Sequence, residues 1–246
     1  MNEAILAVVL LNALGFLSAW LLQTDKLTDL LYSTSFVVMI IVLWVGGDGT
    51  GGITSWLYLM VLIWAIRLGG YLFWRIHAMG RDARFDDMRP SFWRFMGFWV
   101  LQTVSILMIG LPLLLTAGET AEPQLTIYLG AGIWLTGFLV ETIADWQKFS
   151  FKRRHPDQFM SSGLWRRIRH PNYLGEILVW TGVFLASIPL LEGVTWLALL
   201  SPVWIFILLR YISGIPLLEE RAEEKYGDQP EYQAYRQNSG RLLPKW

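Results

Sequence analysis

Seven long runs of apolar residues divide the chain, separated by short polar links or by longer charged segments. The runs cover residues 4–22, 31–46, 53–74, 96–116, 125–144, 173–191 and 194–213. Because about 20 mostly apolar residues in a helix cross the core of a bilayer, each run predicts a membrane-spanning helix. The runs are too long and too uniform for the strands of a membrane barrel. We therefore expect an all-α polytopic membrane protein, a seven-transmembrane-helix bundle forming a single domain over residues 1–246.

Composition agrees with a membrane protein. Hydrophobic residues make up 54% of the chain and charged residues only 16%, and the mean hydropathy is +0.41. The chain has no cysteine, which excludes disulfides and thiolate metal sites, and its three histidines are too few and too scattered to predict a metal site. The start, MNEAILAVVLL, has an acidic residue and no basic region, so we expect a retained first helix rather than a cleaved signal peptide.

The basic residues predict the orientation. All except Arg67 and Arg210 fall on one side of a seven-span arrangement: Lys26, Arg75, Arg81, Arg84, Arg89, Arg94, Lys148, Lys152, Arg153, Arg154, Arg166, Arg167, Arg169, Arg221, Lys225, Arg236, Arg241 and Lys245. The links on the other side, among them the one that contains Asp48, carry no base. By the positive-inside rule, the N-terminus is expected outside and the C-terminus in the cytoplasm. The 20 basic and 20 acidic residues cancel, so net charge identifies no partner, and we expect the lipid bilayer rather than a nucleic acid.

Ionisable and polar side chains interrupt three of the spans. They are Arg67, Tyr71 and Arg75 in the third, Glu141 and Asp145 in the fifth, and Asn172 and Glu176 at the start of the sixth. Within each set the residues are four apart, so they share one face of a helix. Because such groups are costly in a bilayer, they indicate either the wall of a polar cavity or buried pairs, such as Arg67 with Glu141 or Glu176.

The segment S-S-G-L-W-R-R-I-R-H-P-N-Y-L-G-E, residues 161–176, carries most of the candidate chemistry. Gly163 and Pro171 punctuate an irregular stretch, and Pro171 is suited to the first turn of the sixth span. The exposed N–H groups of that helix end, with three arginines and His170 beside it, suit an anionic ligand such as a phosphate. A basic loop that touches anionic lipid is the alternative.

The C-terminal tail, residues 215–246, has too many charges for another span. Its pattern predicts a helix that ends near Gly227 and a second short helix that holds Tyr232 and Tyr235. The tail is expected either as an amphipathic helix on the membrane surface or as a lid over a cytoplasmic cavity.

Several motifs resemble a known family. S-G-L-W…R-H-P-N-Y-L-G-E and L-L-E-E-R…K-Y-G…Y-x-x-Y…P resemble the C-terminal part of the steroid 5-alpha-reductase superfamily. T-D-K-L-T-D (24–29) and I-R-L-G-G-Y-L-F-W-R-I-H-A-M-G-R-D-A-R-F-D (66–86) resemble its bacterial branch DUF1295. The resemblance covers nearly the whole chain. It implies a seven-helix fold in a bacterial inner membrane, and NADPH-dependent reduction of a carbon–carbon double bond conjugated to a carbonyl. The cofactor would enter from the cytosol, and a small apolar substrate from the membrane.

The resemblance also implies site residues. Asn172 and Glu176 would hold the nicotinamide-ribose region, Asp145 would bind the cofactor, and Lys152 would meet phosphate, with its neighbour Arg154 able to help. Tyr71 and Glu176 are the expected catalytic residues. The full set expected to bind the cofactor is Arg67, Tyr71, Asp145, Lys152, Arg154, Gly163, Leu164, Trp165, His170, Pro171, Asn172, Tyr173, Glu176, Glu219 and Tyr235.

The chain departs from the reductases at two places. Trp64 stands where they have a proton-donating Tyr, and an indole cannot give up a proton in catalysis. The second span reads Y-S-T-S-F and lacks their Gln-Glu pair. Tyr71, Tyr32 or water would then supply the acid, and the substrate is expected to differ from a steroid.

Two other functions fit the same residues. Isoprenylcysteine carboxyl methyltransferases carry a similar R-H-P-x-Y-x-G, which makes S-adenosylmethionine the alternative cofactor. A membrane scaffold without enzymatic activity is the third hypothesis.

Overall fold

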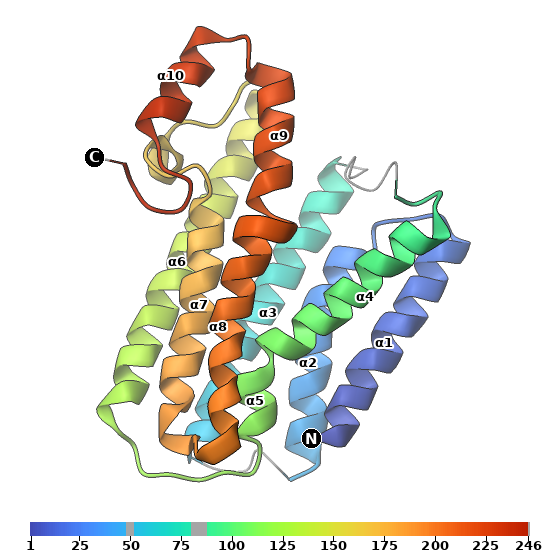
Figure 1. Ribbon diagram of the computed structural model, residues 1–246, viewed down its shortest axis with the longest axis vertical. Coiled ribbons are helices and arrows are strands. Elements are labelled where there is room, and N and C mark those ends of the chain that lie inside the picture. Colours follow the sequence, from blue (N-terminus) through green and yellow to red (C-terminus); the bar gives the residue numbers. More distant parts are fainter. Residues whose placement is uncertain (48–51, 80–87, 246) are drawn as a thin grey trace. The chain divides into compact units, whose positions relative to one another are not determined.

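The computed structural model describes residues 1–47, 52–79 and 88–245. Asp48, Arg81 and Arg84, which the orientation argument uses, lie outside these residues. The described part of the chain is helical, with one isolated β-bridge between Ile168 and Gly240 (Figure 1). Within the described residues, seven helical segments are long and apolar enough to cross a membrane, which confirms the predicted all-α fold and the number of spans.

The first five spans begin near the predicted residues. They are α1 (Asn2–Leu21), α2 (Thr28–Val45), α3 (Gly52–Met79), α4 (Phe92–Ile109) with α5 (Leu111–Leu115), and α6 (Leu125–Arg154). The fourth is interrupted at Gly110, because Pro112 in the first turn of α5 lacks the N–H that a continuous helix needs. The fifth runs ten residues beyond the predicted end at 144. Lys152 and Arg154 therefore lie on a helix and not in the loop where the sequence placed them.

The last two spans are less regular. The sixth combines α7 (Pro171–Ser187) with the 3₁₀ turn η3 (Ile188–Leu190), and Pro171 opens it as predicted. The seventh joins the 3₁₀-helix η4 (Gly193–Leu199), α8 (Leu200–Ile207) and the π-helical turn η5 (Leu208–Ile212). The tail follows as α9 (Ile215–Tyr226) and α10 (Pro230–Asn238), with Gly227 after α9, as the sequence predicts.

The chain divides into two compact units. The first contains Met1–Tyr128 and Val183–Ser201, and the second contains Leu129–Gly182 and Pro202–Trp246. A polar network links three helices inside the first unit. The Asn12 amide donates to Ser35 Oγ at 2.9 Å, and Gln102 Nε2 donates to Asn12 Oδ1 at 3.1 Å. All three side chains are buried, so these bonds join α1, α2 and α4 where water is excluded.

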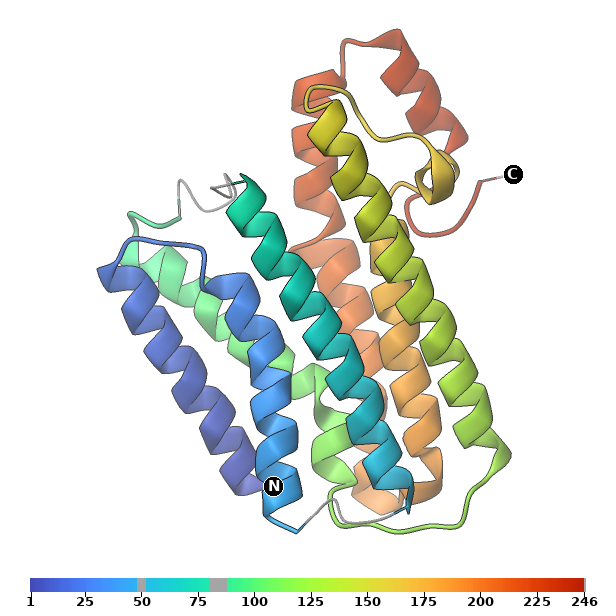
Figure 2. The same cartoon turned by 180° about the vertical axis from the view of Figure 1, so that it is seen from behind.

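Glycines bring α6 and α7 together in the second unit, where both views show the two helices side by side (Figure 2). A Cβ on Gly137 would lie 2.6 Å from the carbonyl oxygen of Gly175. One on Gly182 would lie 2.6 Å from the carbonyl oxygen of Gly130. Gly130 and Gly137 are seven residues apart on α6, as are Gly175 and Gly182 on α7. This spacing places the two glycines of each helix on its contact face. This close backbone approach fixes the position of the first turns of α7, which carry Asn172 and Glu176.

Candidate functional site

The centre of the candidate site is the carboxylate of Glu219 on α9. Arg169 binds it at two points, with Nε 2.7 Å from Oε1 and Nη2 3.1 Å from Oε2. His170 Nε2 lies 3.1 Å from Oε1, and Arg241 Nε lies 3.3 Å from Oε2. The side chains of Arg169 and Glu219 are 10% and 11% exposed. A two-point arginine–carboxylate pair that is this well buried is among the stronger polar contacts in proteins.

The other arm of Arg169 holds the end of the tail. Its Nη1 donates to the carbonyl oxygen of Arg236 at 3.0 Å and to that of Ser239. The backbones pair beside it, since Arg169 N–H donates to the Gly240 carbonyl at 2.8 Å and Gly240 N–H to the Arg167 carbonyl at 3.0 Å. The tail is therefore bonded to the segment that precedes α7. Both predicted roles of the tail, an amphipathic helix on the membrane surface and a lid, stay predictions.

Trp165, in the 3₁₀ turn η2 (Gly163–Arg166), anchors this segment to both neighbours. Its indole N–H donates to the Ala144 carbonyl of α6 at 3.0 Å, and its own carbonyl accepts from the Tyr235 hydroxyl at 2.6 Å. Lys148 Nζ lies 4.6 Å from the centre of the indole ring. Burial raises the pKa of Tyr235, so its phenol stays protonated and keeps donating. Trp165 and Tyr235, both expected to contact the cofactor, here bond the tail to the segment that precedes α7.

Gln147 on α6 contacts both Gly163 and Leu164 and fixes their positions. Leu164 N–H donates to Gln147 Oε1 at 3.0 Å. Gly163 has a φ of +61°, and a Cβ there would lie 2.5 Å from the same oxygen. Only glycine fits both the backbone conformation and this close approach.

His170 is buried directly before α7. Burial lowers its pKa, and the nearby charges of Lys148 and Arg169 act in the same direction, while the hydrogen bond with Glu219 opposes them. Its ring is nearly parallel to that of Tyr173, with the centroids 5.7 Å apart and an angle of 13°. The imidazole is therefore neutral near pH 7.

Lys152 and Arg154, the residues expected to meet phosphate, differ in their surroundings. Lys152 Nζ donates to the Tyr226 hydroxyl at 2.8 Å and to the carbonyls of Gln158 at 2.5 Å and Pro156 at 3.3 Å. These three bonds use all its N–H groups. Arg154 and Arg166 are exposed, and neither has an ion pair within residues 1–47, 52–79 and 88–245. Of the two expected residues, Arg154 is thus the one open to an incoming anion, and Arg166 is open as well.

The remaining second-unit candidates lie on α6 and α7. Asp145 is buried, 6% exposed, one turn after the buried Glu141. Pro171 is buried, while Asn172, Tyr173 and Glu176 are half-buried on the first turns of α7. Asn172 and Glu176 thus stay partly accessible although they belong to a highly apolar helix.

Arg67 and Tyr71 belong to the first unit. The guanidinium carbons of Arg67 and Arg75 lie 5.6 Å and 5.9 Å from the centre of the Tyr71 ring, which confirms their shared face. Arg75 also pairs with Asp29 at 2.8 Å. Trp64 is fully buried, with its ring centroid 5.3 Å from that of Phe36. Its indole is a packing element of this unit. That the stripes of the two units line one cavity stays a prediction.

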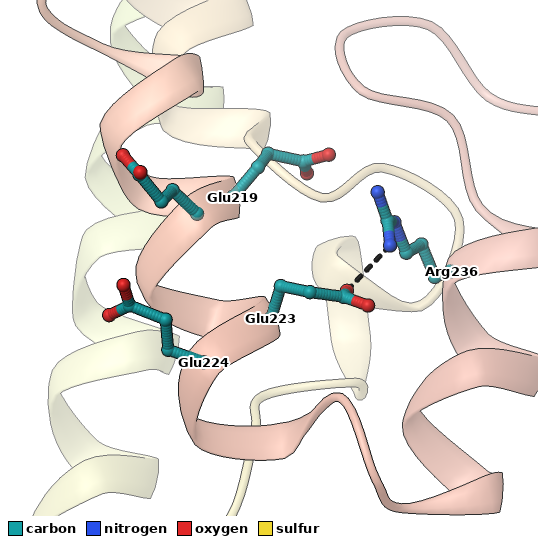
Figure 3. A pocket seen from close by; sticks show the side chains of 5 residues that line it. Glu219, Glu223, Glu224 and Arg236 are labelled. Atoms are coloured by element: carbon teal, nitrogen blue, oxygen red, sulfur yellow. Dashed lines mark hydrogen bonds and ion pairs between the residues drawn. The ribbon is translucent and has the colours of Figure 1, made fainter.

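An open hollow of about 400 Å³ lies beside the Glu219 centre and is lined by Glu219, Glu220, Glu223, Glu224 and Arg236. Arg236 pairs with Glu223 at 2.5 Å, and Glu224 points away from this pair (Figure 3). The hollow is lined by four carboxylates and one guanidinium, and this excess of negative charge repels an anion, so it does not suit a phosphate.

Sequence reasoning missed several partners. Asp25 and Asp29, four residues apart in the T-D-K-L-T-D motif, pair with Arg89 and Arg75. Asp29 lies in the first turn of α2 and Asp25 shortly before the helix, and two acidic residues this close together in the motif were an available signal. Arg241 and Ser239 lie about 70 residues after Arg169, and no local pattern connects them.

Comparisons with known proteins give a single match. Neither the curated proteins nor the solved structures contain a significant match to this chain. Residues 15–239 match the family described as "Protein of unknown function (DUF1295)", and since this match covers most of the chain, the protein belongs to that family.

Proposed function

We propose that this membrane protein is an NADPH-dependent reductase of the steroid 5-alpha-reductase type that acts on a lipid-like, enone-type substrate. One observation carries the proposal: Asn172 and Glu176 lie one turn apart at the start of α7 and are half-buried rather than sealed in the core. An amide and a carboxylate in that position supply the donors and acceptors that a carboxamide and a ribose need. Membership of DUF1295 supports the proposal through the family resemblance of the sequence.

The bound cofactor would supply the hydride, while the protein would orient it and exclude water. Asn172 and Glu176 would hold the nicotinamide-ribose end. The exposed Arg154 and Arg166 would meet phosphate, in place of the fully engaged Lys152. Tyr71, whose ring centre lies 5.6 Å and 5.9 Å from the guanidinium carbons of Arg67 and Arg75, would donate the proton.

One observation favours a second candidate function, an S-adenosylmethionine-dependent methyltransferase. Arg169 and Lys152, two of the cations nearest the motif, are engaged with Glu219 and with the Gln158 carbonyl. S-Adenosylmethionine carries no phosphate and would need neither of them.

We further propose that the protein resides in a bacterial inner membrane, with its N-terminus outside and its tail in the cytoplasm. A cytoplasmic tail would place the lid on the side where either cofactor is available. The basic bias of the links supports this orientation.

Ligand-induced stabilisation tests the cofactor. The purified protein in detergent would be heated with NADPH, NADH or S-adenosylmethionine, since a ligand that binds only the folded state raises the unfolding temperature. We expect NADPH to stabilise the wild type and to have no effect on Asn172→Ala or Glu176→Gln. The exposed Asn238→Ala and Glu231→Gln serve as matched controls and should respond like the wild type. Stabilisation by S-adenosylmethionine alone would contradict the reductase and support the methyltransferase.

A further inference from the structure

The two ring nitrogens of His170 have different surroundings. The residue is 6% exposed, and Nε2 lies 3.1 Å from Glu219 Oε1. Nδ1 is also buried, yet it has no hydrogen-bond partner in the described part of the chain. Buried polar atoms in native proteins are nearly always paired, so an unpaired ring nitrogen beside the R-H-P-N-Y motif calls for a partner.

The contacts of Glu219 determine which nitrogen carries the proton. Its carboxylate accepts from both Arg169 and Arg241, so it is ionised and can only accept. His170 Nε2 must therefore be the N–H that donates to it. Because the ring is neutral, Nδ1 has a free lone pair and is an acceptor.

The orientation of the ring is also determined. Tyr173 lies nearly parallel to it, and a half-turn of the imidazole would break the bond to Glu219. Nδ1 is thus an acceptor whose direction does not depend on a mobile side chain.

We infer that His170 Nδ1 accepts a hydrogen bond from a neutral donor of the bound ligand, either a hydroxyl or a primary amide. Phosphate and carboxylate oxygens are excluded because they are themselves acceptors. An ammonium is disfavoured because the charges of Lys148 and Arg169 act on the same ring. This inference rests on the proposed function for the identity of the ligand: NADPH offers both its carboxamide and its ribose hydroxyls.

Nitrogen NMR tests the acceptor directly. In ¹⁵N-histidine-labelled protein, His77→Gln and His155→Gln assign the remaining signal to His170. We expect a protonated Nε2 and an unprotonated Nδ1, whose resonance moves when NADPH is added. A protonated Nδ1 in the free protein would overturn the inference.

If NADPH fails to bind, the reductase proposal fails, and S-adenosylmethionine, which has ribose hydroxyls, becomes the probe. An Nδ1 resonance that responds to neither ligand, as for a nitrogen bonded only to water, also overturns it.

Two substitutions test the two ring nitrogens separately, because each amide side chain overlaps one of them. His170→Gln places an amide near Nε2 and keeps a donor for Glu219, but it has no acceptor at Nδ1. His170→Asn places an amide near Nδ1 and keeps an acceptor there, but it has no donor for Glu219. We expect His170→Gln to bind about tenfold more weakly and His170→Asn to bind better than His170→Gln, with the exposed His155→Gln unchanged as the control. Equal affinity of His170→Gln and the wild type, or weaker binding by His170→Asn than by His170→Gln, would contradict the inference.

A cofactor analogue identifies the donor. The 3-acetylpyridine analogue of NADPH replaces the carboxamide by an acetyl group, which has no N–H. If the amide is the donor, His170→Gln and the wild type should bind this analogue equally. If a ribose hydroxyl is the donor, the tenfold difference should persist. Either result agrees with a neutral donor, and stronger binding of the analogue by His170→Gln than by the wild type would refute it.

Discussion

Arg169 and Glu219 form a two-point ion pair across fifty residues of sequence, with Nε–Oε1 and Nη2–Oε2 distances of 2.7 Å and 3.1 Å. Arg169 lies two residues before α7, and Glu219 lies on α9. Because the same guanidinium also binds carbonyls of the tail, this pair couples the tail to the start of the helix that carries Asn172 and Glu176.

Glu219→Gln should loosen the tail. The substitution removes the carboxylate that Arg169, His170 and Arg241 contact, and leaves the largely buried guanidinium of Arg169 without its counter-ion. We expect a loss of about 1–3 kcal/mol in the free energy of unfolding. Trypsin should also cleave faster at Arg236 and Arg241, which limited proteolysis with mass spectrometry would detect.

Glu224→Gln is the matched control for this change. Glu224 is exposed on the same helix and lines the same hollow, but it has no ion pair among the described residues. Its substitution should leave both the stability and the cleavage rate within error of the wild type. Equal cleavage of the two variants would show that Glu219 does not hold the tail in place.

Much of the fold follows from local patterns, whereas the organisation of the site does not. Runs of apolar residues are enough to predict seven spans, and Pro171 and Gly227 mark helix ends through their backbone preferences. The sequence pattern did not predict the extension of α6 to Arg154, because charged residues end a membrane span but need not end the helix. The partners of Arg169 depend on tertiary packing and leave no trace in local sequence.

The stability of the protein should fall as pH decreases below about 6.5. The pKa of His170 is lowered from its ordinary value of 6.5, so the unfolded chain binds a proton in this range before the folded chain does. Above that value both forms are neutral and the residue contributes no pH dependence. Thermal unfolding between pH 7.5 and 5.5 should show the decline, and His170→Gln should reduce it. An identical pH profile in the variant would contradict the assignment.

Gly175→Ala should separate α6 from α7. A Cβ there would lie 2.6 Å from the Glu141 backbone nitrogen and 2.7 Å from the Gly137 carbonyl oxygen, and neither atom can move freely. We expect destabilisation of about 1–3 kcal/mol and weaker cofactor binding. Gly132→Ala is the control on α6, where a Cβ meets nothing within 4 Å, so it should be neutral or stabilising. Similar stability of the two variants would refute the close approach of the helices.

Because the chain has no cysteine, single introduced cysteines can report the orientation of the protein in the membrane. Single cysteines at Glu122 and at Gln237, both exposed, would be treated in intact cells with a membrane-impermeant maleimide. In intact cells we expect labelling of Glu122→Cys and none of Gln237→Cys. After lysis, Gln237→Cys should also be labelled. Labelling of Gln237→Cys in intact cells would place the tail outside and remove the cytoplasmic cofactor from the account.

Candidate site residues could be chosen from the sequence, but their contacts could not. The spacing of Asn172 and Glu176 predicts one face of α7, and the structure places both there. The family resemblance implied that Lys152 meets phosphate, but packing brings the Tyr226 hydroxyl and two carbonyls to its ammonium. Charge patterns identify a basic face, while the distribution of acceptors in the folded chain decides which cations remain open.

Isotope transfer tests the central claim, reduction by NADPH, most directly. Membranes containing the wild type or Glu176→Gln would be incubated with deuterated NADPH and, in parallel, with methyl-labelled S-adenosylmethionine, and their lipids analysed by mass spectrometry. The account predicts an apolar product that carries one deuterium from the cofactor with the wild type and not with the variant. A methyl-labelled product with no deuterium transfer would contradict it.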